Sequence, residues 1–210
     1  MAAALGAGLP VSEAAGSMVI DIGGGTTEVA VVSLGGVVES ESIKTAGDAF
    51  DEAIVRYVRR KHNILIGKRT AEELKIGIAC LVPRAEVGIQ EVKGRCLTTG
   101  LPKSVKISSV ELVEAIAEPA RDILETIHMV LERTPPELVA DVAQNGIIMA
   151  GGGSLIYGFD QLVEKDTGIR TTVVDDALSC AAFGSGKMLM NLNDMQDGMV
   201  NLARKRQMKA

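Results

Sequence analysis

The sequence predicts an α/β protein, with a mixed sheet flanked by helices and a smaller α+β subdomain inserted into it. Two apolar runs rich in β-branched residues each end in three glycines, at residues 18–25 and 147–153. Patterns typical of strands come first, and patterns typical of helices and of strands then follow one another along the rest of the chain. Hydrophobic residues make up 47% of the 210 residues, which is enough to form a sizeable core.

The first third of the chain predicts a short helix followed by a meander of three strands. Ala2 to Leu5 are helix formers, and alternating apolar residues follow them. The expected strands are residues 17–22, 27–34 and 37–43, joined by Gly23–Gly25 and Gly35-Gly36. A helix over Asp48–His62 follows, because Phe50, Ile54, Tyr57 and Val58 recur at helical spacing after a start at Gly47-Asp48.

The middle of the chain predicts two helices around a pair of strands. Thr70 and Glu73 have the spacing of a capping box, so a helix is expected over Thr70–Ile78. Strands are expected at residues 87–93 and 103–108, linked around Gly100. A long helix then runs from Ser108 or Ser109 to about Arg133, and Pro119 is expected to introduce a kink within it.

The last third predicts alternating helices and strands. Pro135-Pro136 opens a short helix, since proline is tolerated in the first turn. A strand at 146–150, a helix at 154–165, a strand at 170–174 and a helix at 178–192 follow. We therefore expect a discontinuous large subdomain (1–47 and 109–192), an inserted small subdomain (48–108) and a polar, basic tail (193–210). Such a tail is either solvated or in weak contact with an anionic surface.

Composition excludes several classes of function. A net charge of −5, 2% aromatic residues and the lack of Trp argue against nucleic-acid binding. Cys80, Cys96 and Cys180 form no Cys-x-x-Cys motif, and two histidines cannot complete a soft-metal cluster with them. We expect reduced thiols in a cytoplasmic protein. No apolar run approaches the ~20 residues of a membrane span, and the start lacks the basic region of a signal peptide.

The two glycine runs are candidate phosphate-binding loops. Backbone N–H groups at glycine turns can come within hydrogen-bonding distance of a phosphate, because no Cβ is in the way. The first run predicts a glycine-turned hairpin, and the second predicts a strand, a turn and then a helix. The helix N-terminus would add partial positive charge at the second run. Either run alone is also explained as an ordinary turn, whereas two of them suggest a nucleotide held between elements of one domain.

These motifs resemble the actin, heat-shock-70 and sugar-kinase superfamily. Asp21–Glu28 (DIGGGTTE) is similar to its second phosphate loop, and Ala150–Leu155 (AGGGSL) to its adenosine loop. Within the superfamily the chain resembles MreB, the bacterial actin family of rod-shaped cells. The strings that carry this narrower resemblance are AAALGAGLPV from Ala2, GSMVIDIGGGTTEVA from Gly16, IGKRTAEELK from Ile66, TGLPK from Thr99 and TPPELVAD from Thr134. The resemblance covers residues 1 to roughly 191 and implies an actin-like ATPase fold.

The resemblance implies roles for the residues around the first glycine run. Asp21 would face Mg²⁺ through water, and Glu28 would be a second outer-sphere partner. Thr26 and Thr27 would lie beside the γ-phosphate, with Thr26 orienting the attacking water. The alternatives are a turn-capping Asp21 and an exposed strand residue at Glu28.

The resemblance also implies the remaining contacts to the nucleotide. Gly23, Gly24 and Gly25 would bind phosphate, and Gly151, Gly152, Gly153 and Ser154 would lie at the adenosine. Glu72, Glu73, Leu74 and Lys75 would hold the ribose and adenine edge. Glu72 and Lys75 share a helix face, so a surface ion pair is the alternative. Gly77 stands where MreB usually has Glu, and it is expected to shorten or bend the end of this helix.

The function implied by the resemblance is that of an ATP- and Mg²⁺-binding bacterial actin. Such a protein assembles with itself into cytoplasmic filaments at the inner face of the plasma membrane, and works with the cell-wall elongation machinery and its membrane adaptor proteins. We expect this chain to correspond to the C-terminal half. The first phosphate loop, a Glu that polarises water and the membrane-anchoring elements belong to the other half, so the chain alone is expected to be a poor ATPase. The alternatives are a heat-shock-70-like chaperone, a sugar kinase or a non-catalytic remnant.

Overall fold

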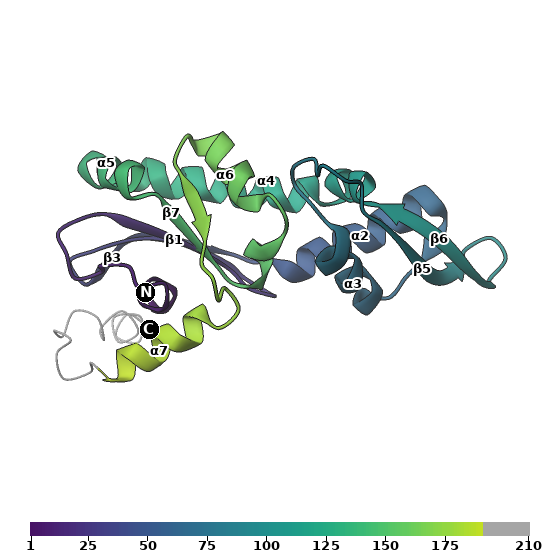
Figure 1. Ribbon diagram of the computed structural model, residues 1–210, viewed down its shortest axis with the longest axis horizontal. Coiled ribbons are helices and arrows are strands. Elements are labelled where there is room, and N and C mark those ends of the chain that lie inside the picture. Colours follow the sequence, from purple (N-terminus) through teal and green to yellow (C-terminus); the bar gives the residue numbers. More distant parts are fainter. Residues whose placement is uncertain (191–210) are drawn as a thin grey trace, which may run out of the picture.

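The computed structural model describes residues 1–190, which form an elongated molecule with two sheets (Figure 1). The larger sheet has the strand order β3-β2-β1-β7-β8. Its strands are β1 (Ser17–Ile22), β2 (Thr27–Ser33), β3 (Gly36–Ile43), β7 (Ile147–Ala150) and β8 (Thr171–Val173). The first three strands are antiparallel neighbours, whereas β7 runs parallel to β1 and β8 parallel to β7. The predicted mixed sheet is confirmed.

Helices cover both faces of this sheet (Figure 1). On one face lie α4 (Ser109–Arg133), α5 (Pro136–Asn145) and α6 (Phe159–Thr167), and on the other lie α1 (Ala2–Gly6) and α7 (Cys180–Met190). Strand β1 is therefore buried on both faces. Its Ile20 and Ile22 belong to the main core, whereas Val19 packs in a second cluster with α1 and α7.

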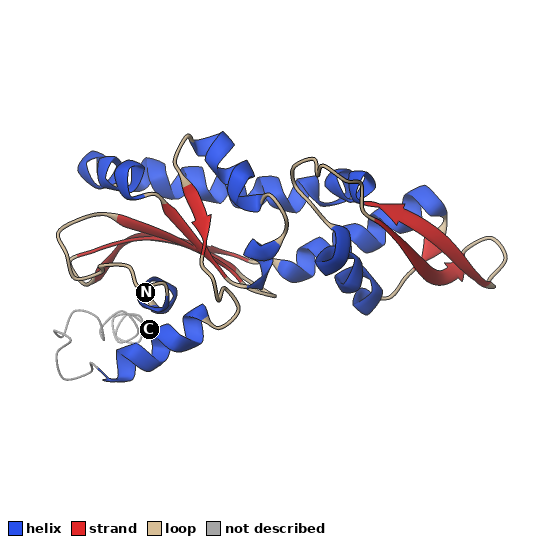
Figure 2. Cartoon of the chain, in the orientation of Figure 1, coloured by secondary structure: helices blue, strands red, loops and turns tan. Residues whose placement is uncertain are grey.

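The smaller sheet lies at the other end of the molecule, beside two helices (Figure 2). Its strand order is β4-β5-β6, and all its pairings are antiparallel. The strands are β4 (Ile64–Leu65), β5 (Ile89–Cys96) and β6 (Pro102–Ser108), and the helices are α2 (Gly47–His62) and α3 (Lys68–Ile78). The short strand β4 was not expected from the sequence, because two residues carry no recognisable period.

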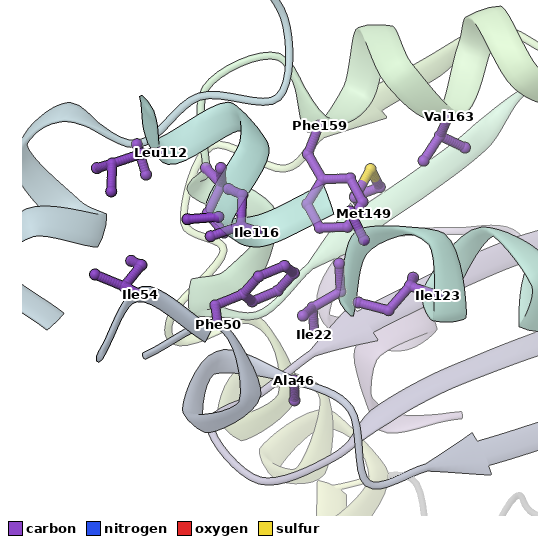
Figure 3. Close-up of a cluster of buried hydrophobic side chains, with 14 of the residues drawn as sticks. Ile22, Ala46, Phe50, Ile54, Leu112, Ile116, Ile123, Met149, Phe159 and Val163 are labelled. Atoms are coloured by element: carbon purple, nitrogen blue, oxygen red, sulfur yellow. The ribbon is translucent and has the colours of Figure 1, made fainter. Parts of the chain in front are cut away.

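One apolar core joins the two sheets. Phe50 at the start of α2 meets Phe159 at the start of α6 edge to face, with ring centroids 6.1 Å apart (Figure 3). Both side chains are fully buried, and the same cluster continues to Ile22 on β1 and Leu112 on α4. Aromatic pairs in this geometry stabilise a core beyond the area that they bury. The start of α2 is therefore held firmly against the larger sheet.

The long helix confirms its predicted bounds. Its N-terminus is closed by a capping box in which Ser108 accepts a hydrogen bond from the Glu111 backbone, and the Glu111 side chain accepts one from the Ser108 backbone. The helix continues through Pro119 to Arg133. The loss of one backbone donor at Pro119 therefore does not interrupt it.

The predicted start of α3 was wrong, and α2 also begins without a side-chain cap. Helix α3 begins at Lys68 after Gly67, with no side-chain cap, and Glu73 pairs with Arg69 instead of closing a box with Thr70. Helix α2 begins at Gly47 after Ala46, again without a side-chain cap. The end of α3 runs through Gly77 to Ile78, where a Cβ at residue 77 would lie 2.7 Å from the Gln90 amide oxygen. The expected shortening at Gly77 was wrong, because the helix continues to Ile78.

The predicted start of the helix over residues 154–165 was also wrong, although residues 159–165 are helical as expected. A 3₁₀ turn, η1 (Gly152–Leu155), is followed by an irregular segment, and α6 begins only at Phe159. Tyr157 accepts a backbone hydrogen bond from Leu81, at 2.9 Å, and Gly158 has a left-handed φ of 78°. Both features take this segment out of a helical path. The end of the expected last helix (191–192) and the tail lie outside the described residues.

No helix within residues 1–190 has both the length and the apolar character needed to cross a bilayer.

Candidate functional site

The two glycine runs meet at one edge of the larger sheet. Strands β1 and β7 are parallel neighbours, and Asp21 pairs with Ala150 at their carboxyl ends. Gly23–Gly25 follow β1, and Gly151–Gly153 follow β7. Parallel strands of open α/β sheets place ligands outside their carboxyl ends. The structure thus brings together two sequence motifs that lie far apart along the chain.

The second run touches the end of β1 so closely that only glycine fits. Gly151 has φ 82°, and a Cβ there would lie 2.3 Å from the Ile22 carbonyl oxygen and 2.6 Å from Oδ1 of Asp21. A Cβ on Gly153 would lie 2.3 Å from the Ile22 side chain. Gly151 also donates a backbone hydrogen bond to Ala177, at 2.9 Å. The partly buried Asp21 carboxylate therefore lies against the second run, at the end of the strand that leads into the first.

Two carboxylates face each other across the hairpin. Asp21 on β1 pairs directly with Glu28 on β2, so both side chains project from the same side of the sheet. Burial, and next the charge of Glu28, raise the pKa of Asp21 above its ordinary value. A cation between these groups would remove the repulsion. No group of three or more metal-ligating side chains occurs in the described part of the chain, so Mg²⁺ here would rely on one or two carboxylates and water.

The two threonines of the hairpin differ in their surroundings. Thr27 is buried, and its hydroxyl donates to the Thr45 carbonyl at 2.7 Å. Thr26 is exposed, and its carbonyl accepts a hydrogen bond from the backbone N–H of Gly23 at 2.9 Å. The Thr27 hydroxyl is thus used to hold the segment between β3 and α2. Of the two, Thr26 has the hydroxyl that can contact a ligand.

The N-terminus of α2 holds the first glycine turn from behind. Gly47 donates a backbone hydrogen bond to Gly23 at 3.0 Å, and Asp48 donates one to Gly24 at 2.7 Å. Gly24 and Gly25 are exposed, and a Cβ on either would meet nothing within 4 Å. The turn is therefore held by α2 on one side, and its Gly24 and Gly25 are open to solvent on the other.

Helix α3 brings one of its four candidate residues to this turn. The Lys75 ammonium donates to the Gly47 carbonyl at 3.1 Å and to Oδ2 of Asp51 at 3.0 Å. Glu72 is exposed, Glu73 pairs with Arg69, and the Leu74 side chain is buried in the core. Any contact between Leu74 and a ligand would therefore use its backbone.

Two residues next to the site, Gly47 and Asp51, were missed by the sequence reasoning. Gly47 was expected only as a helix start, and Asp51 carried no signal because its partner Lys75 lies on another helix. Their roles depend on tertiary contacts between α2, α3 and the first glycine turn.

The second run lacks the helix N-terminus that the sequence predicted beside it. Ser154 is buried, and its hydroxyl donates to the Gly151 carbonyl at 2.7 Å. Gly152 is exposed at the start of the four-residue turn η1. Backbone groups of this short turn, rather than the N-terminus of α6, therefore border the site.

A mixed sheet of this order, with two glycine loops at its edge, defines an actin-like fold, and the solved structures similar to this chain have it. MreB5 of Spiroplasma citri, solved bound to ADP, matches with a TM-score of 0.89 and 39% identity, over 91% of this chain and 58% of that one. The MamK double helical filament matches with a TM-score of 0.74 and 25% identity, over 90% and 57%.

The chain belongs to the MreB/Mbl protein family, whose model matches residues 1–197. It is 50% identical over 198 residues to the cell shape-determining protein MreB of Escherichia coli (strain K12), covering 94% of this chain and 57% of that protein. It is 44% identical over 193 residues to the cell shape-determining protein Mbl of Bacillus subtilis (strain 168), covering 92% and 58%. The family expected from the motifs is confirmed, and the chain spans less than two thirds of these relatives.

We expect Gly151→Ala to destabilise the protein by at least about 2 kcal/mol, because it adds backbone strain to a steric overlap with β1. Urea unfolding measures the change. Gly168→Ala is the matched control, since Gly168 has a similar φ of 72° but open space around it. Equal losses in the two variants would contradict the close contact at Gly151.

We expect Asp21→Asn to be more stable than the wild type at pH 7. The raised pKa of Asp21 means that the folded chain holds this proton more tightly than the unfolded chain, so ionisation disfavours folding. The difference should shrink as the pH falls through the raised pKa, and vanish below the ordinary value of 3.8. Urea unfolding across this range tests it, with the exposed loop variant Glu86→Gln as control. A pH-independent difference would contradict the assignment.

Proposed function

We propose that the chain binds ATP with Mg²⁺ at the edge of the larger sheet where the two glycine runs meet. The observation that carries the proposal is the contact of Gly151 with Asp21 and Ile22, since it places a carboxylate at the point where two loops with exposed glycines meet. MreB5 of Spiroplasma citri has been solved bound to ADP and to AMPPNP, which supports a nucleotide as the ligand.

The first glycine turn would take the phosphates. Gly24 and Gly25 are open to solvent and can approach a phosphate closely. Asp21 and Glu28 would hold Mg²⁺ through water, and the ion would neutralise phosphate charge when bound. Thr26 would orient a water molecule, because its hydroxyl is exposed whereas that of Thr27 is used within the fold.

The sugar and base would lie between α3 and the second glycine run. Lys75 on α3 is held at the first turn by Gly47, and Glu72 is exposed one turn away. Gly152 offers open backbone on the opposite side. Glu73, Leu74, Gly153 and Ser154 would contribute through backbone or by shaping these elements, because their side chains are paired or buried.

We also propose the division into two subdomains that the sequence suggested, with residues 48–108 inserted into a unit formed by 1–47 and 109–192. The two separate sheets support it. The shared core around Phe50 and Phe159 implies that the subdomains pack as neighbours with little freedom at this point.

At the level of the whole protein, we propose a cytoskeletal role. The protein would assemble with itself into filaments at the inner face of the plasma membrane and guide cell-wall synthesis with the elongation machinery. The MamK double helical filament supports self-association within this fold, and the cell shape-determining relatives support the role.

Calorimetry with ATP and Mg²⁺ tests nucleotide binding. A polypeptide of these 210 residues should bind weakly, at least about tenfold less tightly than a full-length relative, because it spans only 57% of the related MreB. Chelating Mg²⁺ or introducing Asp21→Ala should reduce the affinity further, with Glu86→Gln as control. Tight binding that is unchanged in Asp21→Ala would contradict the site, and lack of binding in a full-length protein would favour a non-catalytic remnant.

Electron microscopy tests assembly. We expect the 210-residue polypeptide to form no ordered filaments with ATP, since a contact made by part of a subunit keeps only part of its area. Interfaces well below ~1,000 Å² are rarely stable. Open filaments need two different complementary surfaces on each subunit. Straight, nucleotide-dependent filaments from this polypeptide alone would show that it carries the whole longitudinal contact.

A further inference from the structure

A buried ion pair joins α2 to α3 beside the first glycine turn. The Lys75 ammonium lies 2.9 Å from Oδ1 of Asp51 and donates to Oδ2 at 3.0 Å. The side chains are only 12% and 8% exposed. A second pair between the same helices, Lys68 with Glu52, is 68% and 52% exposed. Helices α2 and α3 are therefore joined by one buried ion pair and one solvent-exposed ion pair.

Stability alone is a poor explanation for the buried pair. Removing two charges from water costs about as much as their attraction returns, so an apolar pair of similar volume would often be as stable. Both carboxylate oxygens of Asp51 lie within 3.0 Å of the Lys75 ammonium, so the buried charge of Asp51 depends on this one cation. Burial raises the pKa of Asp51 despite the hydrogen bond from Lys75. The pair is thus expensive for the fold to keep.

The pair connects directly to the first glycine turn. Lys75 also donates to the Gly47 carbonyl at 3.1 Å, and the N–H of Gly47 donates to Gly23 at 3.0 Å. A Cβ on Gly47 would lie 3.2 Å from the Gly23 carbonyl oxygen, so no slack separates the helix from the turn. A displacement of Lys75 is therefore transmitted through one residue, Gly47, to the backbone of the first glycine turn.

We infer that Asp51 is a positioning residue of the nucleotide site, which fixes the Lys75 ammonium and so couples the sugar side of the cleft to the phosphate-binding turn. This inference rests on the proposed function. An ammonium has three N–H donors, and Gly47 and Asp51 occupy two of them. The third can reach an acceptor on the sugar or base. A contact there would stabilise the position of Gly47 and therefore of the first turn. The sugar and base would then strengthen the binding of the phosphates, so ATP would bind more tightly than its phosphates alone.

The first test needs no ligand. Amide hydrogen exchange in the 210-residue chain reports the two bonds from Gly47 and Asp48 to the glycine turn. Asp51→Asn should speed exchange at these two amides at least about tenfold, because Lys75 is no longer held. Glu52→Gln, which breaks the solvated pair between the same helices, should leave them unchanged. Unchanged exchange in Asp51→Asn would overturn the coupling.

The second test separates positioning from simple support of the fold. The affinities of ATP and inorganic tripolyphosphate are compared in the wild type and Asp51→Asn, titrated by NMR at millimolar ligand. The wild type should prefer ATP, and Asp51→Asn should lose most of this preference while its binding of tripolyphosphate changes little. Parallel weakening of both ligands is the result of a purely structural role and would overturn the inference.

If Asp51→Asn fails to fold, the double variant Asp51→Asn/Lys75→Gln replaces it, because no lone charge is then left buried. The same loss of ATP preference is expected, and a retained preference would overturn the inference. Failure of the wild type to bind either ligand would overturn the proposed function together with the ligand part of this inference. The exchange result distinguishes that case, since it measures the coupling without nucleotide.

Discussion

The rest of the site depends on the close contact between Gly151 and the end of β1. The parallel pairing of β1 with β7 brings two chain segments to one edge, but the loops meet only because residue 151 lacks a Cβ. This contact places the Asp21 side chain between the two runs. The apolar core beneath, with Ile22 at its edge and Phe50 against Phe159, keeps the loops from relaxing apart.

Charge at the site works against the stability of the isolated fold. Asp21 faces Glu28 across the hairpin, and Asp51 is buried against a single cation, Lys75. Both carboxyl groups have raised pKa values, chiefly because they are buried. Carboxylates with raised pKa values are common at functional sites, where a bound cation or ligand reduces their repulsion. Without such a ligand, the aliphatic core offsets the free energy that they cost the fold. Fold and site therefore make opposing demands on the same strands and helices.

The sequence predicted the strands and the long helix well, because their signals are local. Apolar runs rich in β-branched residues indicated β1 and β2, and α4 begins after its Ser108–Glu111 capping box, close to where it was expected. Prediction failed where a distant segment decided the local shape. Leu81 donates a hydrogen bond to the Tyr157 carbonyl where the helix was expected, and the helix begins only at Phe159. The partner of Lys75 could not be inferred from its own helix. The two glycine runs were predictable as motifs, whereas their mutual contact required the pairing of β1 with β7.

The contacts of Gly47 with the first glycine turn and with Lys75 have a consequence for how related sequences change over time. A larger residue there would have to be accompanied by a shift of the glycine turn, and a change at residue 75 would free the Gly47 carbonyl from the residue that holds it. Substitutions at positions 23, 47, 51 and 75 are therefore not independent. A relative that has lost one of these residues should have altered the others, and such linked replacement would mark lineages in which the cleft has taken on a different ligand or none.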